Sequence, residues 1–281
     1  MESQRKHPRT YSFEFFPPKT ADGAEKLRET RRQLEGLKPK FFSVTFGAGG
    51  STRDRTLDTV LEIQQAGFEA APHLSCIGST KADIAETLAR YRAAGIRHIV
   101  ALRGDLPSGS IGVGELRYAN ELVRFIRDTT GDWFDIEVAC YPEYHPQAKS
   151  PGDDLANFSR KVGAGANAAI TQYFYNADAY FRFVEDCERL DIAIPIVPGI
   201  MPIGNFSQLA RFSDACGAEI PRWIRLKLQS YADDADSIRA FGLDVVTELC
   251  QRLLAAGAPG LHFYTMNQAG LTTEIWKRLG L

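Results

Sequence analysis

The sequence predicts a single (β/α)8 barrel spanning residues 1–281. Eight short runs rich in aromatic and β-branched residues alternate with longer amphipathic segments, an order typical of parallel βαβ units. A barrel of this kind needs ~250 residues, which the chain provides almost without remainder. No linker, low-complexity tract or change in composition marks a second domain. Eight repeats favour a closed barrel over an open, doubly wound sheet.

The predicted strands are the short apolar runs. They lie at residues 11–16, 41–46, 69–77, 98–103, 134–141, 168–175, 193–200 and 260–266. Each run is too short for a helix and is followed by a segment with helical spacing, so each reads as a buried strand. In such a barrel the eight carboxyl ends meet at one mouth, where the active site lies.

The segments between the strands space their apolar residues three and four apart, as amphipathic helices do. Examples are residues 53–66, 81–94, 116–128, 154–162 and 177–190. Ser51-Thr52 and Thr80 are good helix N-caps. Gly67, Gly95, Gly165 and Gly257 stand where helices should end. The irregular stretch 217–232 predicts an extra helix and loop before the last long helix, 233–256.

Composition excludes several classes of protein. The chain has 33 Lys and Arg against 35 Asp and Glu, without the basic excess of a nucleic-acid binder. No stretch approaches the ~20 apolar residues of a membrane-spanning helix, and no apolar signal segment follows the N-terminus. The five cysteines are scattered and form no CxxC pair, which suits reduced thiols and no metal site. We therefore expect a cytoplasmic protein.

Polar side chains cluster at the predicted strand ends. They are Glu14, Thr45, His73, Arg103-Gly104-Asp105, Tyr141 with His145, Gln172, and Tyr264 to Asn267. These groups would converge at the barrel mouth and line a polar site large enough for a cofactor. The common nucleotide, zinc-protease and hydrolase motifs are absent from the sequence.

Each of these residues also has a plainer interpretation. Glu14 stands between Phe13 and Phe15, where a carboxylate must be paired, exposed or raised in pKa; it could be an outward-facing strand residue. Asp105 could form a salt bridge with Arg103 or cap a helix. His73 could be a core histidine as readily as a ligand contact.

Two further features are ambiguous on spacing alone. The glycine-rich stretch 47–50 could cradle a phosphate, but a tight turn after a strand needs the same residues. Phe212 falls at helical spacing, which by itself favours a position in the core.

The residues that carry chemistry resemble those of the bacterial methylenetetrahydrofolate reductase family, in the same order along nearly the whole chain. The matching segments are FEFFPPK (13–19), VTFGAGGSTRDRT (44–56), PHLSCIG (72–78), HIVALRGDLP (98–107), YPEYHPQAKS (141–150), AGANAAITQYFY (164–175), PGIMPI (198–203) and HFYTMN (262–267). FEFFPP, LRGDLP and YPExHPxA together are highly specific.

This resemblance implies a (β/α)8 flavoprotein that reduces 5,10-methylenetetrahydrofolate to 5-methyltetrahydrofolate with FAD and NADH or NADPH. Small molecules would be its partners, and a homo-oligomer is expected. Glu14 would be the general acid, and Asp105 would stabilise the cationic form of the substrate. FAD would be held by Phe46, Ala48, His73, Arg103, Gly104, Asp105, Ala119, Tyr141, His145, Ala148, Asp154, Asn157, Arg160 and Lys161. Substrate contacts would come from Thr45, Asp105, Gln172, Gln208, Phe212 and Gln268.

The chain departs from the family pattern at two places. Gln268 stands where the family has Arg, so a charged contact to the folate glutamate tail is not expected there. The loop 107–116 is longer than usual, which affects the alignment of Ala119. The regulatory domain of animal relatives, which senses S-adenosylmethionine, is not expected.

The expected chemistry divides the roles of the two carboxylates. Opening the substrate's five-membered ring requires a proton at N10, so burial should raise the pKa of Glu14. One flavin face would serve donor and acceptor in turn, giving a ping-pong cycle. The alternatives are a flavin-free barrel lyase, disfavoured by the lack of a strand-end lysine, and a non-catalytic flavin- or folate-binding barrel.

Overall fold

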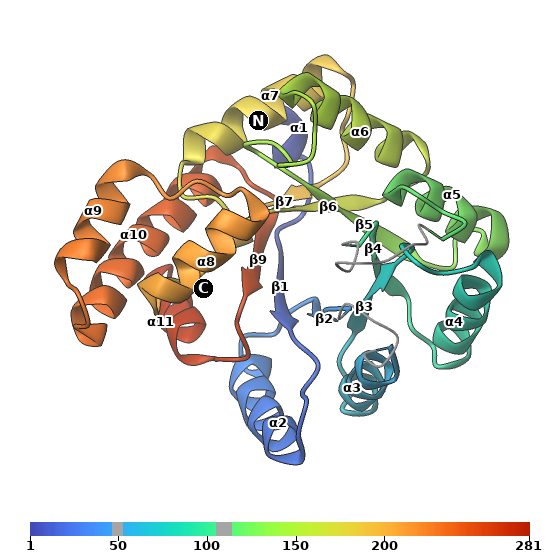
Figure 1. Cartoon of the computed structure of the whole chain (residues 1–281), viewed down its shortest axis with the longest axis horizontal. Helices are drawn as coiled ribbons and strands as arrows, with labels where there is room; N and C mark the ends of the chain where they lie inside the picture. The colour runs from blue at the N-terminus through green and yellow to red at the C-terminus, as the bar shows by residue number, and fades with distance from the viewer. Residues whose placement is uncertain (47–52, 105–113) are drawn as a thin grey trace.

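The computed structural model describes residues 1–46, 53–104 and 114–281 (Figure 1). Its strands are β1 (Thr10–Phe15), β2 (Phe41–Val44), β3 (Ala70–Ser75), β4 (His98–Leu102), β5 (Asp135–Cys140), β6 (Ala168–Thr171), β7 (Ile196–Val197), β8 (Gly199–Ile200) and β9 (Gly260–Tyr264). All pair in parallel, in the order β7-β6-β5-β4-β3-β2-β1-β9-β8. The two ends of this order are consecutive in the chain, so the sheet curls into a nearly closed barrel. The predicted fold class is confirmed.

Nine strands replace the eight predicted because the seventh run divides at Pro198. Proline has no N–H to donate to a neighbouring strand. The residues before it pair with β6 and those after it pair with β9. The Pro198 carbonyl still accepts a hydrogen bond from the His262 N–H at 2.9 Å. The divided run is therefore the seam at which the barrel closes.

The helices surround the sheet (Figure 1). They are α1 (Glu2–Arg5), α2 (Ala21–Glu35), α3 (Arg53–Gln65), α4 (Lys81–Ala93), α5 (Ala119–Thr130), α6 (Pro151–Gly163), α7 (Ala177–Arg189), α8 (Phe206–Cys216), α9 (Arg222–Ser230), α10 (Ala235–Ala256) and α11 (Gly270–Arg278). Helix α9 is the extra helix predicted before the last β/α unit. No described helix has the length and apolar character needed to cross a membrane.

The predicted helix ends are confirmed where the structure describes them. Thr80 caps α4: its hydroxyl accepts from the Asp83 N–H at 3.1 Å, and the Asp83 carboxylate accepts from the Thr80 N–H at 3.1 Å. The four glycines predicted to end helices have positive φ, for example 76° at Gly95. Ser51 and Thr52 lie outside the described residues.

Helix α1 was not predicted, because four residues carry too little periodicity to signal a helix. It delivers Gln4, which is fully buried against the seam strand β7. The Gln4 amide donates to the Ile194 carbonyl at 3.1 Å and accepts from the Ile196 N–H at 2.7 Å. This one side chain thus binds the first N–H of a strand only two residues long and a carbonyl just before it.

Alternate residues of each strand face the helices or the barrel interior. Phe13, Phe15 and Phe42 belong to the large apolar layer beneath the helices. A separate small cluster of Phe41, Ala71, Val100 and Ile170 fills the barrel interior. Toward the carboxyl ends of the strands the interior also contains polar side chains, among them Glu14, Thr45 and His73. A functional site can form at this end of the barrel.

The amino-terminal end of the barrel contains a buried carboxyl group, Glu137 on β5. Glu137 is 6% exposed, and its Oε2 has no hydrogen-bond partner among the described residues. Burial raises the pKa of Glu137 to about 7; nearby Lys40 opposes this shift and Asp135 adds to it. The group is therefore largely protonated in the folded protein below neutral pH.

We predict that Glu137→Gln stabilises the protein increasingly as pH rises. The unfolded chain loses this proton near its ordinary pKa of 4.5, whereas the folded chain keeps it to about pH 7. The wild type therefore loses stability across that window, by on the order of 3 kcal/mol in full, and the glutamine variant does not. Melting temperatures measured from pH 5 to 8 test this, with exposed Glu248→Gln as the control. A difference between variant and wild type that is independent of pH would contradict the assignment.

Candidate active site

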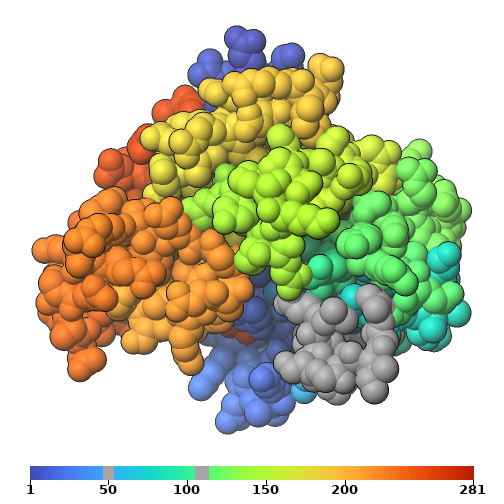
Figure 2. All heavy atoms as spheres, turned by 45° about the horizontal axis from the view of Figure 1, so that its top comes forward, coloured from blue at the N-terminus to red at the C-terminus, as the bar shows by residue number. Residues whose placement is uncertain are grey.

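A cavity of about 500 Å³ opens at the carboxyl ends of the strands. Thr45, Tyr141 and Gln172, which directly follow or lie just beyond β2, β5 and β6, all line it. Figure 2 shows this face hollowed between α8 (orange) and the segment after β5 (lime green). The predicted mouth is therefore where the polar strand-end residues meet.

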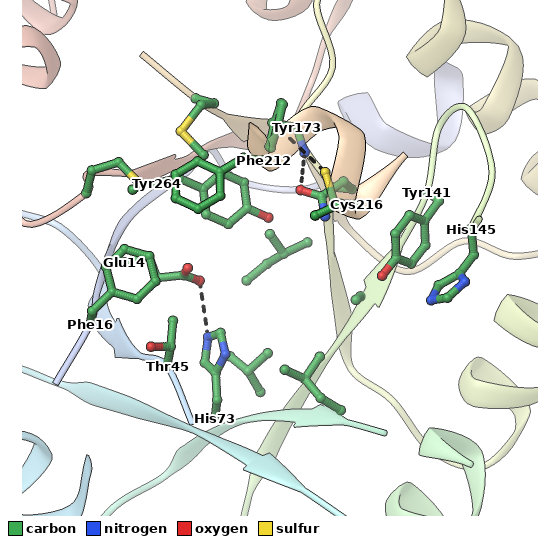
Figure 3. Close-up of a pocket in the computed structure, with 18 of the residues that line it drawn as sticks. Glu14, Phe16, Thr45, His73, Tyr141, His145, Tyr173, Phe212, Cys216 and Tyr264 are labelled. Carbon is green, nitrogen blue, oxygen red and sulfur yellow. Dashed lines mark hydrogen bonds and ion pairs between the residues drawn. The ribbon is translucent and has the colours of Figure 1, made fainter. Parts of the chain in front are cut away.

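Glu14 projects into this cavity opposite Tyr141 and His145 (Figure 3). His73 Nε2 lies 3.2 Å and His262 Nε2 lies 3.4 Å from the same carboxylate oxygen, Glu14 Oε2. All three side chains are largely or fully buried. The outward-facing interpretation of Glu14 is therefore wrong. His73 is buried, as a core histidine would be, and it also lines the cavity.

The pKa of Glu14 is lowered, not raised as expected from the sequence. Burial does raise it, but the charges and hydrogen-bonding of His73 and His262 outweigh burial and bring this pKa down to about 2. The aromatic neighbours that suggested an apolar setting, Phe13 and Phe15, face the helix layer instead. The carboxylate is thus ionised at neutral pH.

His262 is a site residue that sequence reasoning missed. It is fully buried, and its Nδ1 lies 2.7 Å from the Ser12 hydroxyl. The available signal was strand alternation: His262 precedes Tyr264 by two residues, so both face the interior. Its partner Ser12 precedes Glu14 by two residues in the same way. The register Ser12↔His262 and Glu14↔Tyr264 then brings the four side chains together.

The turn after β9 fixes the end of β1. The Thr265 hydroxyl donates to the Glu14 carbonyl at 2.6 Å. The Asn267 amide accepts from the Phe16 N–H at 2.8 Å and donates to the Phe16 carbonyl at 3.0 Å. Met266 and Asn267 reach this arrangement through left-handed φ angles of 55° and 56°. Such strain outside glycine is uncommon and persists where contacts enforce it.

The opposite wall is built by the segment after β5. The rings of Tyr141 and His145 meet edge to face, 4.7 Å apart. The Asp154 carboxylate accepts from the His145 N–H at 2.9 Å, which ties this segment to α6. The Arg103 guanidinium donates to the Gln147 amide oxygen at 2.6 Å.

Gly104 follows Arg103 with a φ of 86°. A Cβ at Gly104 would lie 1.9 Å from the Ser75 hydroxyl, so the backbone after β4 approaches β3 more closely than any side chain permits. Tyr264 closes the cavity nearby: its hydroxyl, whose pKa burial raises, donates to the Thr171 carbonyl at 2.7 Å.

Phe212 separates this cavity from a second one of about 660 Å³ and lines both. Gln208 and Gln268 also line the second cavity. Phe212 is 37% exposed, so the core position favoured by its spacing is wrong. Asn205 begins α8 by accepting from the Gln208 N–H at 2.8 Å, which fixes the helix that carries both residues.

Several residues named from the resemblance do not line these two cavities. Among them are Phe46, Ala119, Ala148, Asn157, Arg160 and Lys161, while Asp154 lies in an adjoining hollow beside Tyr141. Asn157 accepts from Arg160 on the same face of α6. The Lys161 ammonium donates to the Ala139 carbonyl, and burial lowers its pKa. Ala48, the glycines at 47–50 and Asp105 lie outside the described residues.

The side chains of the described residues include no group of three or more His, Cys, Asp and Glu arranged to hold a metal ion. The chemistry available at the mouth is that of a buried carboxylate with two imidazoles, several amides and hydroxyls, and aromatic walls.

A family model for methylenetetrahydrofolate reductase matches residues 1–280. The chain belongs to this family. It is 44% identical to the 5,10-methylenetetrahydrofolate reductases of Salmonella typhimurium and Escherichia coli over 96% of its own length and 90% of theirs. It is 40% identical to methylenetetrahydrofolate reductase (NADH) 1 of Arabidopsis thaliana, over 96% of this chain and 48% of that one. As a member of the family, the chain is an oxidoreductase of folate metabolism.

Solved structures share the fold of this reductase family member. One is a protein of Clostridium thermocellum described as binding two copies of 5-methyl-5,6,7,8-tetrahydrofolic acid, with a TM-score of 0.70 and 15% identity over 100% of this chain and 98% of that one. Another is 3-dehydroquinate dehydratase of Geobacillus kaustophilus, with a TM-score of 0.54 and 12% identity over 97% and 90%. At such identities the likeness concerns the barrel alone.

We predict that Phe212→Ala weakens substrate binding with little loss of stability. An exposed aromatic face offers stacking worth ~0.5–1.5 kcal/mol, so the KM for methylenetetrahydrofolate should rise about two- to tenfold. Steady-state kinetics and melting curves measure the two effects, with exposed Leu226→Ala on α9 as the control. A lower melting temperature with an unchanged KM would return Phe212 to a structural role.

Proposed function

We propose that this chain reduces 5,10-methylenetetrahydrofolate to 5-methyltetrahydrofolate, with FAD as bound cofactor and NADH or NADPH as electron donor, in a ping-pong cycle. Membership of the family supports the reaction. The observation that carries the proposal is the buried Glu14 carboxylate, which lines the cavity and pairs with His73 and His262. Scattered free thiols support a cytoplasmic setting.

The residues present fit a flavin by their chemistry. His73 lines the cavity, with its Nε2 3.2 Å from the Glu14 carboxylate. Tyr141, His145 and Gln172 add hydroxyl, imidazole and amide groups to the same cavity. We propose that these side chains hold the cofactor, with Arg103 and Gly104 beside them. When bound, FAD supplies the two-electron redox chemistry of the reaction.

Glu14 and the histidines form one proton-bearing unit. Ring opening of the substrate needs a proton at N10, and an ionised carboxylate has none to give. An imidazolium at His262 or His73 can pass its proton through Glu14 Oε2, which lies within 3.4 Å of both Nε2 atoms. The hydroxyl of Ser12 fixes the other ring nitrogen of His262, at 2.7 Å. Asp105, we propose, stabilises the iminium cation produced by ring opening.

Gln172 is proposed as the contact shared by both substrates. Its amide donates and accepts, so it can meet a carboxamide or a pterin edge equally well. Its own Oε1 accepts from the Tyr173 N–H at 3.0 Å, which orients the side chain from the backbone of the same segment. Thr45 lines the same cavity and is proposed to meet the nicotinamide. One shared site requires the two substrates to bind in turn.

Glu14→Gln should slow folate reduction while leaving flavin reduction nearly intact. Glutamine keeps the size of the side chain but cannot relay a proton, and general acid catalysis contributes ~10²–10⁴-fold. Hydride transfer from NADH needs no such proton. Stopped-flow absorbance of the two half-reactions, normalised to bound FAD, measures both rates.

The matched control for this variant is Glu69→Gln. Glu69 also pairs with a histidine, with 2.5 Å between its Oε2 and His98 Nε2, but at the amino-terminal end of the barrel. This control should leave both half-reactions unchanged. Equal slowing of both half-reactions in Glu14→Gln would indicate a structural role. Flavin binding without folate reduction in the wild type would support the non-catalytic alternative.

A further inference from the structure

Helix α9, the extra helix before the last β/α unit, exposes two large apolar side chains. Trp223 is 57% exposed and Leu226 is 50% exposed. They stand three residues apart, so they are neighbours on one face of the helix. The opposite face is buried through Ile224 and Leu228, which anchor α9 to the protein. Helix α9 lies beside α10 at the outer edge of the molecule, where a partner can reach it (Figure 1).

Neighbouring rings hold Trp223 in place. The Trp223 ring meets the Phe241 ring of α10 edge to face at 6.0 Å, and the Tyr231 ring also lies 6.0 Å from Phe241. An aromatic side chain that is already ordered loses little freedom when a partner covers it. Tryptophan is also among the residues that contribute most to binding between proteins. Trp223, Leu226, Tyr231 and Phe241, here called the α9 face, thus have the composition of an interface centre.

The two ends of α9 carry opposite charges. Arg222 and Arg225 lie in its first four residues, and Asp233 and Asp236 follow its carboxyl end, where α10 begins. None of these four side chains forms an ion pair within the part of the chain that the structure describes. Cations at the start of a helix oppose its dipole, and α9 has neither an acidic residue in its first turn nor a side-chain cap. The described residues therefore leave the start of α9 without a counter-charge.

A second copy of the chain has the charges that are missing. In a two-fold contact both copies use the same surface, and two α9 helices that meet at their middles across the axis run antiparallel. The basic start of α9 in one copy then faces the acidic residues that follow α9 in the other. A helix of nine residues is only ~14 Å long, so both ends fall within one contact. A purely acidic partner would neutralise the arginines but would repel the aspartates, so the mixed charge favours self-pairing.

We propose that the α9 face is a two-fold interface between two copies of this chain. The exposed tryptophan and leucine of each copy form its centre. At each rim the two arginines of one copy pair with the two aspartates of the other. The buried centre provides most of the affinity, and the charged rims set the antiparallel orientation. This proposal concerns assembly and is independent of the reaction at Glu14.

Sedimentation velocity of the intact chain, from about 1 to 100 µM, measures the state of assembly. We expect the wild type to sediment as a dimer or as a larger assembly built from dimers. Leu226→Arg should halve the size of that assembly, because both copies bring the new charge to the centre of the interface. Leu190→Arg at the end of α7 is the matched control, since Leu190 is 48% exposed, and it should assemble like the wild type.

Charge exchange distinguishes a second copy from any other partner. Arg225→Glu and Asp236→Arg should each raise the dissociation constant of the dimer, by about three- to tenfold. The double variant should recover most of this loss. Because Arg225 and Asp236 form no ion pair within one copy, the recovery requires contact between copies. Arg124→Glu on α5, at an exposed position, controls for the change in net charge.

Two results would overturn the proposal. One is a wild type that stays monomeric over the whole concentration range, which would leave the α9 face to a different partner or to solvent. The other is an assembly that Leu226→Arg leaves unchanged, because another surface would then join the copies. Melting curves check that each variant folds. If Leu226→Arg does not fold, Trp223→Ser replaces it, since this variant adds no charge and should also weaken the dimer.

Discussion

The Glu14 carboxylate inside the barrel imposes the main constraint on this structure. A charge removed from water must be compensated by partners, and Glu14 finds them in His73 on β3 and His262 on β9. The two imidazoles reach one carboxylate oxygen from strands on either side of β1 and so tie three parts of the sheet together. They also change the chemistry of Glu14, because a carboxylate between two imidazoles stays ionised where an isolated buried one would not.

Strand β9 carries much of the site while it also closes the barrel. Its His262 and Tyr264 face the interior, and the following turn holds the end of β1 through Thr265 and Asn267. The strand reaches its position only after the chain has passed through α8, α9 and α10, which separate it from β8. Strand β9 is thus the last strand in the sequence, and it and the turn after it hold Glu14 in place.

Helices α8 and α10, which lie between β8 and β9 in the chain, form part of the wall of the second cavity. Helix α8 brings Phe212 to the boundary, and the first turns of α10 bring Arg239 to the outer side. Glu14 and its two histidines are buried in the barrel, whereas Arg239 is exposed.

Much of the fold and part of the site could be predicted because their signals are local. Alternation of short strands with amphipathic helices determines the barrel, and the residues at strand ends, such as Thr45, Tyr141 and Gln172, follow from their position in each repeat. The burial of Glu14 was foreseeable, but its ionisation was not, because this depends on histidines that lie 59 and 248 positions away in the chain. The same holds for His262, for the exposure of Phe212 and for the place of Arg239. The sequence by itself determined which helices and strands form and which residues lie at the carboxyl ends of the strands. Only the tertiary structure decided which side chains meet there. The reason is that the packing of strands and helices distant in the chain sets the neighbouring charges and the solvent exposure of each side chain.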